Sequence, residues 1–288
     1  MVPGEMHSTD GLDQPGITFQ YLSDLHLEVD DQYSEYTITP TSEYLILAGD
    51  VGSLSDYSAY VTFLQRHCAM FKHIYLVLGN HEFHHLSHAE TLSRARRLEF
   101  EQALSGKVTL LHRRRVDIGP RITILGCTLW SHIPDHACEA VEGRVKDHRF
   151  VEDWSVDAHN SEHEQDTRWL KGELSRLRDE QRRRSVVVVT HHAPSNRGTS
   201  NPEHAQNEWS PAFSTPLLEG KAAAWVGIDM VSHWLFGHTH WTTRLDLSGV
   251  IVVSNQRGYV RTVGDTTFRM QDLGRQDHAF DEGRIIRV

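Results

Sequence analysis

Five hydrophobic segments of the sequence each end in residues that can bind a metal ion. These residues are Asp24 and His26 in "SDLHLE", Asp50 in "LAGD", Asn80, His81 and Glu82 in "LGNHE", His191 and His192 in "VTHHAP", and His238 and His240 in "FGHTH". Any one of them alone is also compatible with a helix cap, a turn or a surface histidine. Five segments with the same type of ending favour one shared site.

The donor set fits two metal ions better than one. Oxygen donors are Asp24, Asp50 and Asn80, and nitrogen donors are His26, His191, His238 and His240. Seven side chains are too many for a tetrahedral zinc ion, but they suit two divalent ions that share a carboxylate. Mixed imidazole and oxygen donors favour Mn, Fe, Zn, Co or Ni over calcium or a copper–thiolate site.

The spacing predicts how these side chains converge. Asp24 and His26 are two residues apart, as are His238 and His240, so in extended segments each pair would point to one side. The adjacent His191 and His192 would point to opposite faces, so only one of them should bind metal. Glycine precedes Asp50, Asn80 and His238, and it permits the tight backbone turns that such a site needs.

The segments that carry these residues read as strands of an α/β fold. Nearly continuous apolar runs predict strands at 17–23, 43–50, 73–80, 121–130, 185–192, 233–238 and 250–255. Helical patterns between the early runs give a β–α–β order. Ligands bind at the carboxyl ends of the strands in such sheets, where these residues lie.

Helix starts are predicted at Ser55 or Asp56, at the capping box Ser87–Glu90 with a stop near Gly106, and at a second box, Ser161–Glu164. Segments 131–160 and 195–216 are polar and lack a clear period, so they are predicted to be long functional loops. The arginine runs 113–115 and 182–184 are expected to be solvated.

Together the motifs resemble the calcineurin-like metallophosphoesterase superfamily. Its pattern D-x-H, G-D, G-N-H-[DE], H and G-H-x-H occurs in order between residues 22 and 240. "YLSDLHLE", "LGCTLWS", "VTHHAPS" and "NQRGY" further resemble a branch of small soluble phosphoesterases. The resemblance implies a four-layer α/β/β/α sandwich of two mixed sheets flanked by helices.

The resemblance also implies a role for each motif residue. Asp24, His26 and His240 would hold one metal, Asn80, His191 and His238 the other, and Asp50 would bridge. The family pattern selects His191 over His192 as the ligand, and His192 would line the pocket. His81 would stabilise the phosphoryl group and protonate the leaving oxygen after attack by a bridging hydroxide.

Substrate contacts are expected from Asn80, His81, His192 and Arg257. The loops 131–160 and 195–216 are expected to determine which substrate binds. Arginines there could clamp a phosphate or form surface ion pairs. Trp130, Trp154 and Trp209 could stack on a nucleobase or simply pack.

Composition bounds the kind of partner. The 288 residues carry a net charge of −10, which argues against stable nucleic-acid binding but allows a small phosphoester if cations line its pocket. No long apolar run or signal peptide is seen, so a cytoplasmic protein without membrane contact is expected. Residues 1–16 are predicted to be a flexible tail and residues 17–288 the phosphoesterase domain; oligomeric state is left open.

The motifs can also be interpreted in terms of other functions. A scaffold that keeps the fold without catalysis would show a degraded motif, such as a substituted Asp50 or His81, and none is seen. A nuclease or a protein phosphatase of the same superfamily is also compatible with the motifs, because the resemblance concerns the chemistry rather than the substrate.

Overall fold

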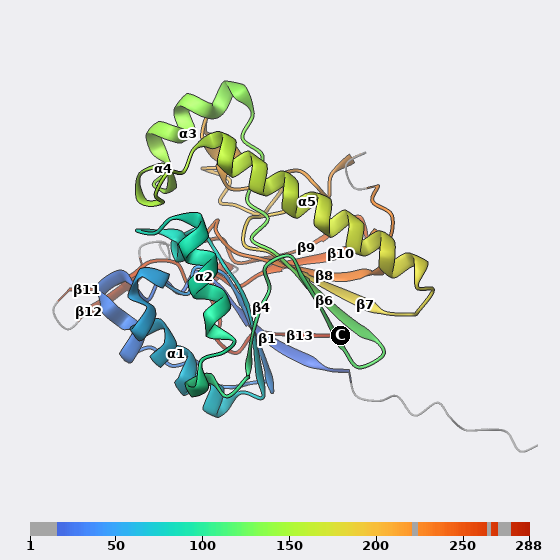
Figure 1. The fold of residues 1–288 in the computed structure, drawn as a ribbon. Helices are drawn as coiled ribbons and strands as arrows, with labels where there is room; N and C mark the ends of the chain where they lie inside the picture. The colour runs from blue at the N-terminus through green and yellow to red at the C-terminus, as the bar shows by residue number, and fades with distance from the viewer. Residues whose placement is uncertain (1–15, 221–223, 264–265, 270–277) are drawn as a thin grey trace, which may run out of the picture.

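Two β-sheets pack face to face in the computed structural model, which describes residues 16–220, 224–263, 266–269 and 278–288 (Figure 1). The first sheet has the order β13-β1-β2-β3-β4, with β13 antiparallel to β1 and the other pairs parallel. Its strands are β1 (Thr18–Leu22), β2 (Tyr44–Ala48), β3 (His73–Val77), β4 (Val108–Leu110) and β13 (Ile285–Arg287).

The second sheet has the order β5-β6-β7-β8-β10-β9. Its inner pairs are parallel, and the edge strands β5 and β9 are antiparallel to their neighbours. The strands are β5 (Arg114–Ile118), β6 (Ile122–Gly126), β7 (Ser185–Val189), β8 (Val231–Phe236), β9 (Thr243–Leu247) and β10 (Val250–Ser254). A small hairpin pairs β11 (Val260–Val263) with β12 (Thr266–Arg269). All seven strands predicted from apolar runs are confirmed.

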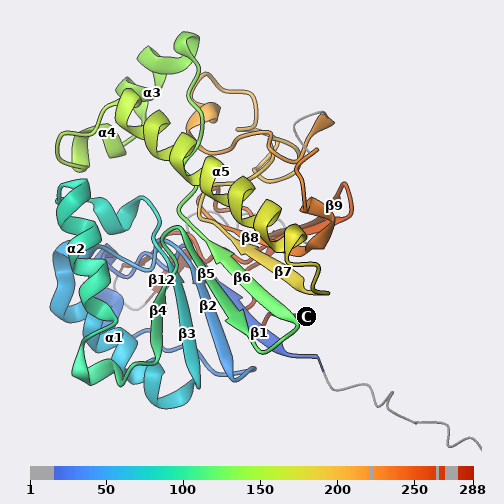
Figure 2. The same ribbon diagram turned by 45° about the vertical axis from the view of Figure 1, so that its right-hand side comes forward.

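Three apolar layers hold the architecture together. Residues such as Ile46, Val77, Val187 and Leu235 fill the space between the sheets. The outer face of the first sheet packs against α1 (Tyr57–Met70) and α2 (His88–Leu98), and that of the second against α5 (Val156–Asp179). Figure 2 shows these helices on opposite sides of the paired sheets. The predicted four-layer α/β/β/α sandwich is therefore confirmed.

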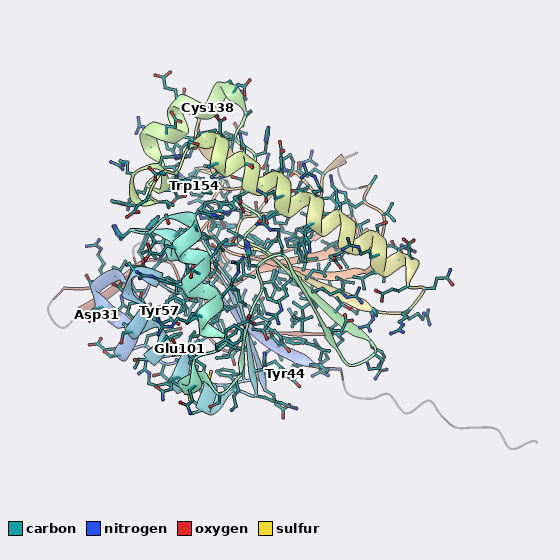
Figure 3. The ribbon with its side chains drawn as sticks, viewed as in Figure 1. Asp31, Tyr44, Tyr57, Glu101, Cys138 and Trp154 are labelled. Atoms are coloured by element: carbon teal, nitrogen blue, oxygen red, sulfur yellow. The ribbon has the colours of Figure 1, made fainter. Side chains whose placement is uncertain are left out.

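The helix starts were predicted with mixed success. The Ser87 hydroxyl accepts a hydrogen bond from the amide of Glu90, as the capping box predicts, but α2 ends at Leu98, well before Gly106. Helix α1 begins after Asp56, whose side chain makes no cap. A hydrogen bond also links the start of α1 to the segment after α2: the hydroxyl of Tyr57, the first residue of α1, donates to Glu101 at 2.9 Å (Figure 3).

The start predicted at the Ser161–Glu164 box was wrong. Helix α5 begins at Val156, and Ser155 caps it by accepting from the amide of Ala158. The predicted loop 131–160 was also wrong, because it contains α3 (Cys138–Arg144) and α4 (Asp147–Phe150) as well as the start of α5. Segment 195–216 agrees better with its prediction, since its only regular element is a 3-10 turn, Ser210–Ala212.

Arginines in the two predicted solvated runs form ion pairs. Arg115 pairs with Asp117 at 2.9 Å and with Glu180, and Arg184 pairs with Asp117 at 3.3 Å. The predicted tail falls in residues 1–15, outside the described residues, apart from Gly16. Among the described residues, no helix has the length and apolar character needed to cross a membrane.

A buried carboxylate on α5 joins that helix to the loop that follows β6. One oxygen of Asp166 accepts from the amide of Leu129 at 2.7 Å, and the other from Arg113 at 3.1 Å. Leu129 and Trp130 both have left-handed backbone angles, with φ of 72° and 46°. The hydrogen bond from Leu129 therefore supports a conformation that non-glycine residues rarely adopt.

We expect Asp166→Ala to lower the free energy of unfolding by about 2–4 kcal/mol, because the buried Leu129 amide loses its acceptor. The measurement is urea denaturation at pH 8, where the carboxylate is ionised although burial raises its pKa to about 7 against the opposing effect of Arg113. Glu162→Ala is the control: Glu162 pairs with Arg113 at 3.0 Å but holds no backbone amide, so a loss of about 1 kcal/mol or less is expected. Equal losses in the two variants would contradict the role of the Leu129 bond.

Candidate metal centre

The carboxyl ends of five strands meet where the two sheets face each other. Asp24 and His26 follow β1, Asp50 follows β2, and Asn80 and His81 follow β3 in the first sheet; His191 follows β7, and His238 and His240 follow β8 in the second. Every one of these side chains is buried or nearly so. The structure therefore brings together all the residues that were predicted to bind metal.

The backbone at these strand ends is not extended, contrary to the sequence prediction. Asp24, His26, Asp50, His238 and His240 all have positive φ, between 49° and 70°. The paired side chains still converge, but through successive left-handed turns rather than through the alternation of a strand. Each such residue carries a conformational cost, and clusters of them are typical of functional sites.

Two glycines make these turns possible. Gly49 has a φ of 87° directly before Asp50. At Gly237, an added Cβ would lie 2.6 Å from an oxygen of Asp24, too close for any other residue. The Asp24 carboxylate uses this space to accept a hydrogen bond from the His238 amide at 2.8 Å, which ties the ends of β1 and β8 together.

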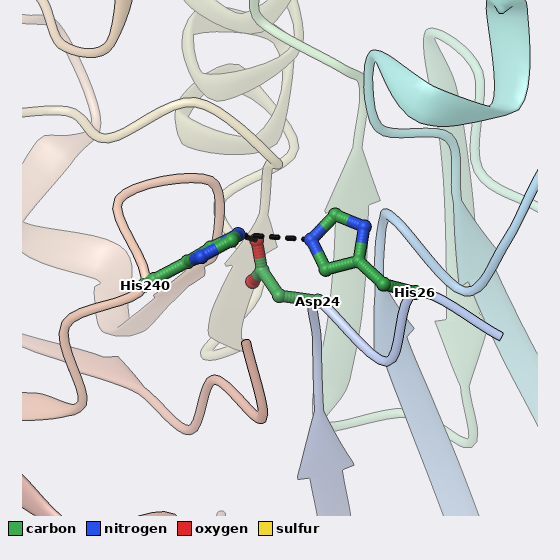
Figure 4. Close-up of side chains that lie close together, drawn as sticks. All are labelled: Asp24, His26 and His240. Carbon is green, nitrogen blue, oxygen red and sulfur yellow. Dashed lines mark hydrogen bonds and ion pairs between the residues drawn. The ribbon is translucent and has the colours of Figure 1, made fainter. Parts of the chain in front are cut away.

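Asp24, His26 and His240 form the first cluster of ligand atoms (Figure 4). The His26 and His240 Nε2 atoms are 2.8 Å apart, and His240 Nε2 lies 3.4 Å from Asp24 Oδ1. The second oxygen of Asp24, Oδ2, is buried without a hydrogen-bond partner. These atoms surround a small space and leave acceptor capacity unused.

Asp50, His191 and His238 form the second cluster. Asp50 Oδ2 lies 3.3 Å from His191 Nε2 and 3.7 Å from His26 Nε2 of the first cluster. Asn80 joins through its Oδ1, which lies 3.0 Å from His191 Nε2. Asp50 is thus the carboxylate between the two clusters.

The hydrogen-bond partners of His191 test whether a cation fits. Its Nδ1 donates to the carbonyl oxygen of Ala48 at 2.9 Å, so in the neutral ring Nε2 carries a lone pair. That lone pair faces oxygens of Asn80 and Asp50, which is unfavourable unless a proton or a metal cation lies between them. His238 has a free, buried Nε2 aimed at the same space.

The electrostatics of the clusters point the same way. Burial opposes the charged form of His191, but Asp50 raises its pKa to about 9. Burial lowers the pKa of His238 to about 3 and that of His240 well below its usual range, so both rings are neutral near pH 7. Burial also raises the pKa of Asp24. The neutral rings of His238 and His240 can bind a divalent metal directly, and the raised pKa of His191 shows that its surroundings favour a positive charge at this ring, which a proton or a metal ion can supply. The residues therefore fit such ions.

Glu82 holds the loops after β2 and β3 in place. Its carboxylate accepts from the amides of Gly79 at 2.6 Å, Asp50 at 2.9 Å and Val51 at 2.8 Å, and from the Tyr60 hydroxyl at 3.1 Å. It is fully buried and lies outside the two clusters. The sequence placed Glu82 only in the motif "LGNHE"; the structure gives it these four donors and a longer fifth, the amide of Gly52 at 3.4 Å.

His81 forms a third group of ligand-type atoms with His26 and Asp50, but both of its ring nitrogens have other partners. Nδ1 lies 2.7 Å from Glu28, and Nε2 lies 3.1 Å from the Tyr259 hydroxyl. Burial opposes its charge, but Asp50 and then Glu28 raise the pKa of His81 to about 9. Glu28 and Tyr259 were not identified as site residues from the sequence, and their only signals were their places in "SDLHLE" and "NQRGY".

Asp147 on α4 connects the polar insertion to the metal centre. Its Oδ1 accepts from Asn80 Nδ2 at 2.8 Å and lies 2.9 Å from His84 Nε2. The Asn80 amide is thereby fixed with its oxygen toward His191. The sequence placed Asp147 only in a loop that selects substrate.

A pocket of about 410 Å³ opens over the centre. Its floor includes Asp50, Asn80, His81, His238 and His240, and its walls come from residues 144–147, residues 196–214 and Tyr259. A volume of this size is typical of sites for small organic molecules.

Two residues predicted to contact substrate lie elsewhere. His192 is buried beneath the pocket, its ring 4.1 Å from that of His238 and 5.3 Å from Trp130, while His191 faces the clusters. Arg257 donates to the carbonyl oxygen of Leu25 at 2.7 Å and to Gln32 at 2.6 Å. Neither lines the pocket, and these contacts favour structural roles for both.

Comparisons with known proteins agree with this geometry. A protein of Acanthamoeba polyphaga mimivirus, uncharacterized protein L509, is 24% identical over 265 residues, which cover 83% of this chain and 90% of that protein. The crystal structure of the phosphopantetheinyl hydrolase PptH from Mycobacterium tuberculosis has a TM-score of 0.62 at 17% identity, covering 85% of this chain and 90% of that one. The latter shows a shared fold.

The family model for calcineurin-like phosphoesterases matches residues 18–242, a range that contains every residue of both ligand clusters. Members of this family generally use divalent metal ions, and the His and Asp groups of this centre can hold them. The chain therefore belongs to the calcineurin-like phosphoesterase family.

Proposed function

We propose that this protein hydrolyses small phosphomonoesters or phosphodiesters with two divalent metal ions. The observation that carries the proposal is the pair of ligand clusters that meet at Asp50 under a pocket. Asp24, His26 and His240 would hold one ion, and Asn80, His191 and His238 the other, with Asp50 shared. When bound, the ions supply Lewis acidity that offsets phosphoryl charge and makes water a better nucleophile.

His81 is proposed as the acid that protonates the leaving oxygen. Glu28 accepts a hydrogen bond from Nδ1 of His81. This bond fixes the ring so that Nε2 lies at the pocket beside the Tyr259 hydroxyl. A donor at this position can transfer a proton to an alkoxide as the phosphorus–oxygen bond breaks. Tyr259 can hold the ring or a phosphoryl oxygen by the same hydroxyl.

The pocket supports a small substrate over a polymer. Its volume of about 410 Å³ fits a molecule the size of a nucleotide. The net charge of −10 argues against a polynucleotide. A catalytically silent scaffold is disfavoured because every motif residue is retained and converges.

Removal of metal should abolish activity. After exhaustive chelation, hydrolysis of bis-p-nitrophenyl phosphate is expected to fall to background, and manganese should restore it. Metal analysis should find about two manganese ions per chain in the restored protein. Full activity in protein shown to be metal-free would contradict a metal-dependent mechanism.

Asp50→Asn should remove the charge shared by both clusters. We expect manganese content to fall to one ion or fewer per chain and kcat/KM for bis-p-nitrophenyl phosphate to fall about a thousandfold or more. Asp157→Asn, the same change at an exposed position on α5, is the control and should leave both values unchanged. Unchanged turnover in Asp50→Asn would refute the bridging role.

His81→Ala should lower kcat about 10²–10⁴-fold while both metal ions are retained, because the leaving oxygen loses its proton donor. The loss should be larger for diphenyl phosphate than for bis-p-nitrophenyl phosphate, since phenolate is the poorer leaving group. His136→Ala at an exposed position is the control. An equal loss for both esters would show that His81 acts otherwise than as an acid.

A further inference from the structure

The outer wall of the pocket carries two cations that the proposed chemistry does not use. Arg144 is the last residue of α3, and Lys146 directly precedes α4. Both are exposed, and both line the pocket above the metal centre. They belong to the polar insertion between β6 and α5, outside the residues of the five motifs.

Aromatic rings, rather than carboxylates, hold these two cations in place. The Arg144 guanidinium lies 5.1 Å from the centre of the Trp209 ring, and Lys146 Nζ lies 5.6 Å from that of Tyr259. Among the described residues, neither has a carboxylate within ion-pair distance. A ring face fixes the position of a cation without cancelling its charge.

The carboxylates in the pocket lining are already engaged. Of the described lining residues, only Asp50 and Asp147 are acidic. Asp50 belongs to the metal clusters, and Asp147 accepts from Asn80 and His84. The arginines of β5 show the contrast, since Arg114 pairs with Glu99 and Arg115 with Glu180. In a chain of net charge −10, unpaired cations at a pocket are available for an anionic ligand.

Both cations line the same pocket as the proposed acid His81, and ring contacts connect Lys146 to it. The Tyr259 ring that lies under Lys146 carries the hydroxyl that is 3.1 Å from His81 Nε2. Trp209, which lies under Arg144, also lines the pocket, as does Phe213, whose ring stacks on that of His238 at 4.6 Å. Lys146 is thus separated from His81 by a single side chain.

We propose that Arg144 and Lys146 form a second anion subsite, so that the preferred substrate is a small phosphoester with a second anionic group. This proposal rests on the proposed function for the reacting phosphoryl group. Arg144 offers a planar set of N–H donors and Lys146 a point charge, both suited to a phosphate or carboxylate. The aromatic walls would contact the organic part between the two anionic groups.

Two esters that differ by one phosphate test the subsite. They are thymidine 5′-(p-nitrophenyl phosphate) and the same ester with a 3′-phosphate, which share a scissile bond and a leaving group. With the manganese-loaded full chain, kcat/KM is expected to be about tenfold higher for the 3′-phosphorylated ester. In the double variant Arg144→Gln/Lys146→Gln, this ratio should fall to about one, with little change for the simple ester.

The control is Arg168→Gln/Lys171→Gln, which removes two cations from α5 outside the pocket; Lys171 also lies over a tryptophan, Trp225, at 4.9 Å. It should keep the wild-type ratio. A ratio near one in the wild type, or an unchanged ratio in Arg144→Gln/Lys146→Gln, would overturn the subsite.

Binding separates failure of the subsite from failure of the proposed function. Calorimetry on manganese-loaded His81→Ala protein measures the affinity for both esters without rapid turnover. If the wild type hydrolyses neither ester but the 3′-phosphate improves binding and Arg144→Gln/Lys146→Gln cancels the gain, the subsite stands and the hydrolytic proposal fails. Equal affinities for the two esters would overturn the subsite whatever the turnover.

Discussion

The metal centre depends on the position of Asp50, and the buried side chain of Glu82 fixes that position. It accepts from the buried amides of Gly79, Asp50 and Val51, each of which would cost about 1–3 kcal/mol if left unpaired. The Asp50 amide is held in this way, and its Oδ1 accepts from the amide of His81 at 2.8 Å. One buried carboxyl group therefore sets the position of the carboxylate between the clusters and of the backbone of the proposed acid, although it belongs to neither ligand cluster.

The backbone conformations and the unpaired buried atoms of the site both cost free energy of folding. Five ligand residues adopt left-handed φ values, and Asp24 Oδ2 and His238 Nε2 are buried without partners. Two sheets packed through a continuous apolar layer can hold strand ends in these conformations because the core determines where each strand stops. Cations would satisfy the unpaired atoms and offset the buried carboxylates, so folding energy from the core is coupled to metal binding.

The strands and the converging ligands could be predicted because both depend on strong local signals. Apolar runs mark buried strands, and parallel strands bring their carboxyl ends to one edge. The insertion could not be predicted in the same way. The first turns of α5 bury His159, His163 and Asp166 rather than an apolar stripe, so no helical period appears before Trp169. The pairing of His81 with Glu28 joins residues 53 positions apart and has no local signal. The backbone at Asp24 and His238 was predicted to be extended. Its positive φ values are fixed by tertiary contacts, for which the local sequence has no signal.

The division between framework and insertion explains where selectivity resides. Ligand residues come from strand ends whose positions the two-sheet core determines, and they can change little without loss of the centre. The walls come from α3, α4 and segment 195–216, joined by the contact of Arg144 with Trp209, and they border the centre through Asp147 and Phe213. Positive charge on these walls would act in the same direction as the proposed metal ions, so we expect the pocket to attract anions even though the chain is acidic. Under the proposed function, a change in the insertion is therefore expected to alter which phosphoester enters while the reacting groups stay in place.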